Sequence, residues 1–267
     1  MKYSIDILVI EITRKCNLKC RHCLRGTAQN KSITQEMINQ IVSKFDYISC
    51  VVFGGGEPSL HPEAIDWFCD AIKMYDVQVG NFYIVTNGKT YSDKLYNACY
   101  RLYNLCTKNE ISGFTISDDE FHRECIVNRH KWNENFLKYA KYKYDNYLYD
   151  EDMSEELYYE LDDENDYLPY FRPFDKKHKD NNFYGIIKMG NAEKNGIWER
   201  EKSIFYPTIK YYSDMLNIED GELYVAYNGD IFPDCDLSYQ VMNKGKYKLG
   251  NINNFDDVII EIKKHRD

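Results

Sequence analysis

Three cysteines near the beginning of the chain carry the strongest chemical signal in the sequence. Cys16, Cys20 and Cys23 follow one another as C-x3-C-x2-C within one short segment. Three thiolates at this spacing can bind three irons of a cubane cluster and leave the fourth iron without a protein ligand. Because a vacant iron can be chelated by a small molecule, the segment predicts a catalytic iron-sulfur centre.

Zinc is the alternative metal for this segment, with His22 or another cysteine as its fourth ligand. Zinc sites usually close with a second pair of ligands, and the sequence has no second C-x2-C and no H-x3-H pair. A non-catalytic metal-binding module that works through partners therefore stays open beside the catalytic interpretation.

A glycine-rich turn, Gly54-Gly55-Gly56-Glu57-Pro58, follows the next apolar run of the chain. Glycines let a ligand approach the backbone closely and leave peptide groups free to pair with it, while Glu57 and Pro58 shape the turn. Gly55, Gly56 and Glu57 are therefore candidate ligand-binding residues.

The elements that must position these residues alternate along the chain between β-branched apolar runs and amphipathic helices. Such alternation predicts an α/β fold with parallel strands and right-handed crossovers, in which the loops after the strands meet at one edge. The cysteines, the glycine turn, Thr86-Asn87-Gly88 and Ser117-Asp118 all fall in those loops, so we expect them on one rim. The expected strands are 5–12, 48–53, 82–86, 111–117 and 183–189, and the expected helices are 33–45, 62–75, 92–106 and 132–144.

The last part of the chain has a different pattern. Apolar segments at 222–227 and 231–232 flank Asn228-Gly229, a pair typical of a tight hairpin turn, and a helix is expected at 255–264. We expect a core domain over 1–215 and a small hairpin-plus-helix cap over 216–267. Within the core, residues 145–182 form an acidic, Tyr-rich insertion that we interpret as a solvated loop.

The cysteine loop, Cys16, Cys20 and Cys23, together with Gly55-Gly56-Glu57 resembles the radical S-adenosylmethionine (SAM) superfamily. The similarity covers roughly residues 5–190 and implies a partial (β/α)6 barrel. It also implies one [4Fe-4S] cluster whose open iron is chelated by SAM, with Gly55, Gly56 and Glu57 at the methionine end. The implied reaction is reductive cleavage of SAM to a 5′-deoxyadenosyl radical that abstracts hydrogen from a substrate.

Further motifs resemble the branch of this superfamily that contains peptide maturases and molybdenum-cofactor synthases. Thr86-Asn87-Gly88 and residues 115–123 are similar to segments of that branch, which implies that Thr86 and Asn87 bind the cofactor. Ser117 and Asp118 would contact the SAM ribose, although Ser and Asp also commonly cap helices. Residues 187–192 resemble a Gly-Arg-Ala turn near the adenine, with Asn191 in place of the arginine, which implies backbone contacts from Met189 and Gly190.

Residues 224–235 and 249–252 resemble a shortened SPASM or Twitch extension, which holds auxiliary clusters in relatives. Beyond Cys125 this chain has only Cys235, so we expect a single cluster unless a barrel cysteine joins Cys235. Cys125 and Cys235 are also candidate hydrogen-atom donors, with a buried structural thiol as the alternative for each. The cysteines expected to be buried and structural are Cys50, Cys69, Cys99 and Cys106.

The resemblance favours a peptide as substrate, with a small metabolite or nucleoside as the alternative, and a reductant such as a flavodoxin or ferredoxin as electron donor. A net charge of −9 over 267 residues makes nucleic acid an unlikely partner, although Lys15, Lys19, Arg21 and Arg25 are clustered. No apolar run approaches the roughly 20 residues that span a bilayer, so we expect no membrane association and a cytoplasmic protein.

Overall fold

The computed structural model describes residues 3–89, 92–109, 112–117, 120–125, 186–212 and 215–265. Asp118, the helix expected at 132–144 and the insertion at 145–182 lie outside the described residues. In chain order the elements are β1 (Tyr3–Thr13), α1 (Gln35–Val42), β2 (Phe45–Gly55), η1 (Pro58–Leu60), α2 (Glu63–Tyr75), β3 (Gln78–Thr86), α3 (Asp93–Tyr103), β4 (Gly113–Ile116), α4 (Glu120–Cys125), α6 (Gly190–Asn195), β5 (Thr208–Tyr212), β6 (Met215–Val225), β7 (Asp230–Phe232), α7 (Tyr239–Asn243), β8 (Gly250–Asn251), η5 (Ile252–Asn254) and α8 (Phe255–Lys264).

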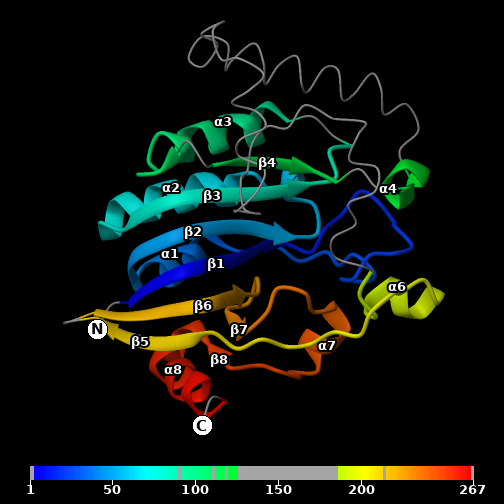
Figure 1. Ribbon diagram of the computed structural model, residues 1–267. Coiled ribbons are helices and arrows are strands. Elements are labelled where there is room, and N and C mark those ends of the chain that lie inside the picture. Colours follow the sequence, from blue (N-terminus) through cyan, green and yellow to red (C-terminus); the bar gives the residue numbers. More distant parts are fainter. Residues whose placement is uncertain are drawn as a thin grey trace, which may run out of the picture.

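One sheet contains all the described strands, in the order β4-β3-β2-β1-β6-β7-β8, with β5 paired to β6 (Figure 1). Strands β1 to β4 are parallel neighbours, which confirms the expected α/β architecture with a parallel sheet. Thr34 caps α1 by accepting a hydrogen bond from Met37 N, and Ser92 caps α3 in the same way through Leu95 N. The helix expected at 33–45 is shorter than predicted because Phe45 already begins β2.

Helices α1, α2, α3 and α8 cover one face of this sheet (Figure 1). Their apolar sides and the facing strand residues form the main hydrophobic core, which includes Cys69, Cys99 and Cys106. These three cysteines are buried as expected, whereas Cys50 on β2 is half-buried. Burial raises the pKa of Cys69 to about 12, so this side chain remains a neutral thiol inside the core.

The opposite face is covered near β1 and β6 by two later parts of the chain. A second apolar cluster forms there around Val9 and Tyr224 of the sheet. The residues that pack against them are Ile187, Met189, Leu237, and Tyr239 and Met242 of α7. The structure therefore encloses the end of β1 between two layers. No described helix is both long and apolar enough to cross a bilayer.

The C-terminal hairpin extends the same sheet. Strand β6 pairs in parallel with β1, from Tyr3 opposite Leu216 to Ile10 opposite Val225, and β7 continues from β6 in antiparallel pairing. An apolar central strand needs hydrogen-bond partners on both edges, and β6 satisfies the edge that β2 leaves open. The hairpin turn is longer than two residues, because β6 ends at Val225 and β7 begins at Asp230. Of the pair Asn228-Gly229, Gly229 alone has a positive φ, 82°.

The strand expected at 183–189 is also different in its described part. Residues 186–189 make one isolated parallel bridge, between Ile187 and Arg200, and then turn into α6. Gly190 has a φ of 57°, so the chain bends sharply there and turns toward the loop after β1.

Phe53 offers a test of the main core. Its side chain is fully buried on β2, and its ring meets Phe68 of α2 edge-on with centroids 5.2 Å apart. We expect Phe53→Ala to lower the free energy of unfolding by about 3–5 kcal/mol, because it removes buried apolar surface and leaves a cavity. The control is Val85→Ala on β3, where the side chain is 41% exposed and the loss should stay within about 1 kcal/mol. Denaturant unfolding of both variants measures the difference, and equal losses would contradict the described packing.

Candidate functional site

The loop that carries Cys16, Cys20 and Cys23 begins where β1 ends and is fixed to the turn after β2. Gly56 N donates to Thr13 O at 2.6 Å, and Glu57 N donates to Lys15 O at 2.8 Å. Cys20 O accepts from Cys23 N at 3.3 Å, which closes a turn inside the loop. The predicted rim therefore exists, and direct backbone hydrogen bonds join two of its predicted parts.

Glycines are required at this junction because the two backbones approach closely. A Cβ atom on Gly55 would lie 2.2 Å from Thr13 O, and one on Gly56 would lie 2.1 Å from Lys15 O. Gly55 also has a φ of 118°, which side chains rarely allow. The close approach that these glycines permit is thus to the chain's own backbone, at the base of the cysteine loop.

Glu57 is buried and its carboxylate joins the ends of β2 and β3. One oxygen accepts from Ser59 N at 3.0 Å and from Thr86 Oγ1 at 2.6 Å, and the other accepts from Asn87 N at 2.8 Å. With this many donors the carboxylate is satisfied as an anion, which is what a buried charge requires. Its contacts make Glu57 a positioning group for the rim.

The next strand ends at this network as well. Asn87 Nδ2 lies 3.7 Å from Cys16 Sγ and donates to Asn17 Oδ1 at 2.9 Å. Ser117 N, just after β4, donates to Thr86 O at 2.9 Å. Asn87 therefore contacts the cysteine loop, Thr86 reaches it through Glu57, and Ser117 lies next to Thr86 at the same rim. Asp118 lies outside the described residues.

Helix α6 holds the cysteine loop from the other side. Asn191 donates from its backbone to Cys23 O at 2.9 Å and from its amide to Cys20 O at 3.1 Å. A Cβ on Gly190 would lie 2.2 Å from Leu24 O, so this glycine too is needed for contact with the loop. Met189, by contrast, packs in the second apolar cluster and its sulfur accepts from Ser238 N.

Sequence reasoning noted Asn191 only as the replacement of an arginine and missed this positioning contact. It also missed the buried pair of Glu11 and Arg14. Arg14 Nε donates to Glu11 Oε2 at 2.8 Å, and Glu11 Oε1 accepts from the hydroxyl of Tyr224 at 2.7 Å. A glutamate within the otherwise apolar run of residues 7–12 was the available signal for this link between the cysteine loop and β6.

A fourth thiol lies beside the three predicted ligands. Cys125, the last residue of α4, packs against the buried Leu18 and Cys20, as Cys16 and Cys23 also do. Burial and the neighbouring thiols Cys125, Cys23 and Cys16 raise the pKa of Cys20 well above its usual range. Burial likewise raises the pKa of Cys16. A bound cation would favour the thiolates instead, so metal binding here releases protons.

The spacing of the thiols bears on which metal suits them. In the described part of the chain, the residues whose ligand atoms all lie within 4.8 Å of one another are Glu222, Asp234 and Cys235, and the three loop cysteines do not meet that limit. Tetrahedral zinc with Zn–S bonds of about 2.3 Å holds its sulfur ligands about 3.8 Å apart. In the described structure, the side chains of Cys16, Cys20 and Cys23 therefore do not form a ready-made tetrahedral zinc site.

Cys235 packs against the second apolar cluster, whereas Cys125 packs beside the cysteine loop. The two candidate hydrogen donors therefore lie in different parts of the structure. The thiol of Cys235 donates to Asp236 Oδ1 at 3.7 Å and its backbone N donates to Glu222. Burial raises the pKa of Cys235 well above its ordinary value, and the nearby carboxylates Glu222 and Asp236 raise it further, so the side chain stays a thiol. Lys202 forms ion pairs with the neighbouring Asp234 at 2.6 Å and Asp236 at 3.3 Å.

Family comparison agrees with this geometry. The model of the Radical SAM superfamily matches residues 10–146, just over half of the chain. The chain belongs to the radical SAM superfamily. This family uses a [4Fe-4S] cluster and SAM, so these are the cofactors of the protein.

Curated relatives of this radical SAM chain match over shorter stretches. Glutamate 2,3-aminomutase of Clostridioides difficile is 27% identical in an alignment of 103 residues that covers 34% of this chain and 24% of the relative. The tungsten-containing aldehyde ferredoxin oxidoreductase cofactor-modifying protein of Pyrococcus furiosus is 31% identical in an alignment of 101 residues that covers 36% of this chain and 26% of the relative. The chain thus matches about a quarter of the length of each relative.

Solved structures show a similar fold. Native anSMEcpe with bound AdoMet and Cp18Cys peptide has a TM-score of 0.50 at 14% identity, over 96% of this chain and 80% of that chain. SuiB of Streptococcus suis bound to S-adenosylmethionine has a TM-score of 0.44 at 14% identity, over 93% and 63%. At 14% identity, the similarity to anSMEcpe shows a shared fold and nothing about the substrate.

Gly56 and Gly54 form a matched pair for testing the junction under the cysteine loop. We expect Gly56→Ala to lower the free energy of unfolding by about 1–3 kcal/mol, because the added methyl group forces Lys15 away. It should also bind less iron after anaerobic reconstitution. Gly54→Ala is the control, since nothing lies within 4 Å of its added Cβ. Unfolding midpoints and iron per chain measure the effect, and identical behaviour of the two variants would show that the junction is not needed.

Proposed function

We propose that this protein is a radical SAM enzyme that modifies a peptide by abstracting a hydrogen atom from it. The observation that carries the enzymatic part is the loop with Cys16, Cys20 and Cys23, whose base is hydrogen-bonded to the Gly55-Gly56-Glu57 turn. When bound to these thiols, the cluster supplies one electron to SAM, which breaks to methionine and a 5′-deoxyadenosyl radical.

The proposed roles of the remaining residues follow from their positions. Gly55, Gly56 and Glu57 hold the loop against β2. The turn that they form would contact the methionine end of SAM. Asn87 donates toward the sulfur of Cys16, and such a bond stabilises a thiolate ligand. The proposed cofactor contacts that complete the site are Thr86, Ser117, Asp118, Met189 and Gly190.

Cys125 is assigned no ligand role in this proposal, because a fourth protein thiolate would close the iron that SAM must occupy. Its packing against Cys20 makes it a neighbour of a ligand. As a thiol beside the cluster loop, it stays a candidate hydrogen donor together with Cys235.

A peptide is favoured as substrate by the resemblance to the peptide-maturase branch, and the fold is shared with anSMEcpe, whose structure holds a peptide. A flavodoxin or ferredoxin is the proposed reductant. The second candidate is a small-metabolite enzyme, which is favoured by the relative named glutamate 2,3-aminomutase.

Anaerobic reconstitution tests the enzymatic proposal. We expect the wild-type chain to bind about four irons and, after reduction with dithionite, to release 5′-deoxyadenosine from SAM. Cys16→Ser, Cys20→Ser and Cys23→Ser should each lose both properties. Cys125→Ser is the control and should keep both. A colourless protein that contains zinc, or loss of the cluster in Cys125→Ser, would contradict the proposal.

Cys235 allows a separate test of hydrogen donation. We expect Cys235→Ala to release 5′-deoxyadenosine as wild type does but to lose transfer of solvent deuterium into product, since the exchangeable thiol hydrogen is gone. The substrate for this assay is any peptide that raises 5′-deoxyadenosine release in a library screen, and mass spectrometry measures the deuterium. Unchanged deuterium incorporation would end this role for Cys235.

A further inference from the structure

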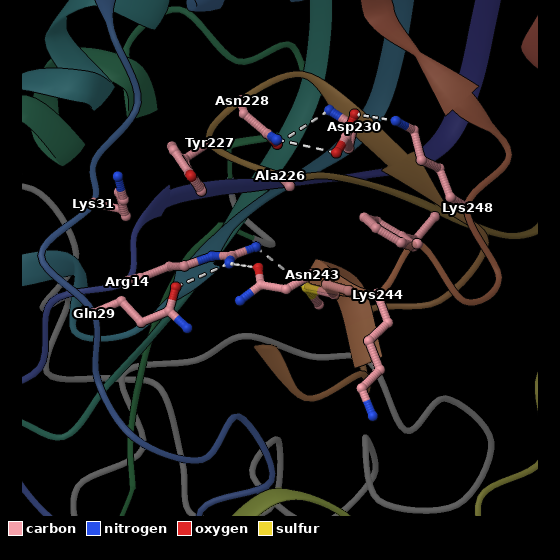
Figure 2. Close-up of a pocket in the computed structure, with 13 residues that line it drawn as sticks. Arg14, Gln29, Lys31, Ala226, Tyr227, Asn228, Asp230, Asn243, Lys244 and Lys248 are labelled. Carbon is pink, nitrogen blue, oxygen red and sulfur yellow. Dashed lines mark hydrogen bonds and ion pairs between the residues drawn. The ribbon is translucent and has the colours of Figure 1, made fainter. Parts of the chain in front are cut away.

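A polar cavity of about 540 Å³ lies between the segment that carries the cysteine loop and the C-terminal part of the chain (Figure 2). Its volume falls in the range of ordinary ligand sites. We call it the Arg14 cavity, because that side chain lies between its two walls. Its lining includes Arg14, Gln29, Lys31, Tyr227, Asn243 and Lys244.

Arg14 is held rigidly at the cavity wall and is 2% exposed. One terminal nitrogen donates to Gln29 Oε1 at 3.1 Å and to Asn243 Oδ1 at 2.7 Å, as the dashed lines in Figure 2 show. Among the described residues, the other terminal nitrogen meets only the sulfur of Met242, at 3.6 Å, which is a weak acceptor. A buried guanidinium with an N–H that lacks an oxygen partner is prepared to receive an anion.

The charge of the cavity points the same way. Four cations line it, namely Arg14, Lys31, Lys244 and Lys248, and they face Asp230 in the lining and Glu11 behind Arg14. The excess of two positive charges contrasts with the net charge of −9 for the whole chain. Lys248 is paired with Asp230 at 2.6 Å, whereas no carboxylate in the described part of the chain pairs with Lys31 or Lys244. The two exposed lysines therefore remain to neutralise a ligand.

The uncharged lining suits a peptide more than a bare ion. Gln29, Asn228 and Asn243 carry amides, which both donate and accept and so can pair with peptide groups. Tyr227 adds an aromatic ring beside Arg14, whose guanidinium carbon lies 4.8 Å from the ring centre. An occupant with one or two carboxylates on a peptide backbone would satisfy all of these groups.

We propose that the Arg14 cavity binds a carboxylate-bearing segment of the substrate peptide and anchors it next to the cysteine loop. This inference rests on the proposed function for the identity of the substrate. Arg14 is well placed for such an anchor, since its own backbone accepts from Gln29 N and donates to Lys31 O, both at 2.9 Å, just before Cys16. The carboxylate belongs either to an acidic side chain or to the end of the peptide.

Fluorescence anisotropy with the reconstituted enzyme and SAM tests the anchor. The probes are three labelled Gly-Ser peptides: one with adjacent internal glutamates and an amidated end, one without acidic residues but with a free terminal carboxylate, and one amidated and neutral. We expect the neutral peptide to bind at least about tenfold more weakly than an acidic one. This corresponds to a binding free energy that is less favourable by about 1.4 kcal/mol. Preference for the first or the second probe identifies the source of the carboxylate.

Charge reversal identifies the site. Lys31→Glu and Lys244→Glu should each weaken binding of the preferred acidic peptide about tenfold, because each places a carboxylate opposite the ligand. Lys108→Glu is the matched control: it makes the same charge change at an exposed position beside the start of β3, where Lys108 N donates to Gly80 O. Its binding should stay within about twofold of wild type.

The inference is overturned if the three peptides bind equally or not at all, or if all three charge reversals have the same effect. Release of 5′-deoxyadenosine without peptide is measured for wild type and for Lys108→Glu, and the two should match. If that release is absent from the wild-type enzyme, the proposed function itself fails. If it is present and charge-dependent binding is absent, only the anchor is wrong.

Discussion

The pairing of the loop after β1 with the turn after β2 is the constraint on which the site depends. Two short backbone hydrogen bonds, from Gly56 to Thr13 and from Glu57 to Lys15, set where the cysteine loop leaves the sheet. They require that residues 55 and 56 have no side chains, because the space is filled by carbonyl oxygens. The same junction brings the carboxylate of Glu57 to the end of β3, so one contact orders three strand ends.

A second layer of contacts fixes the loop from the far part of the chain. Asn191 of α6 binds the carbonyls of Cys20 and Cys23, and the buried Arg14 connects the base of the loop to Glu11 and α7. Removing one partner of a buried ion pair leaves an uncompensated charge, and here both partners are also hydrogen-bonded to other groups. The loop is therefore held on both sides by groups that are far apart in the sequence.

Much of this arrangement was predictable from local patterns. The period of apolar residues predicted the strands and helices of the first half, and in the structure Thr34 and Ser92 cap two of these helices. The convergence of the cysteines, the glycine turn and Asn87 followed from parallel topology alone. Long-range pairing was not predictable in this way. Nothing in the local sequence of β6 states that it pairs with β1, and the turn at Gly190 toward the cysteine loop depends on a partner far away in the chain.

The central place of β1 has a consequence for how the protein is made. One edge of this apolar strand pairs with β2, which follows soon after, but the other edge waits for β6, more than two hundred residues later in the chain. During synthesis the first strand is thus exposed along one side while most of the polypeptide is still being translated. An open edge of this kind invites pairing with other chains. We therefore expect a molecular chaperone to protect this edge until β6 has emerged from the ribosome.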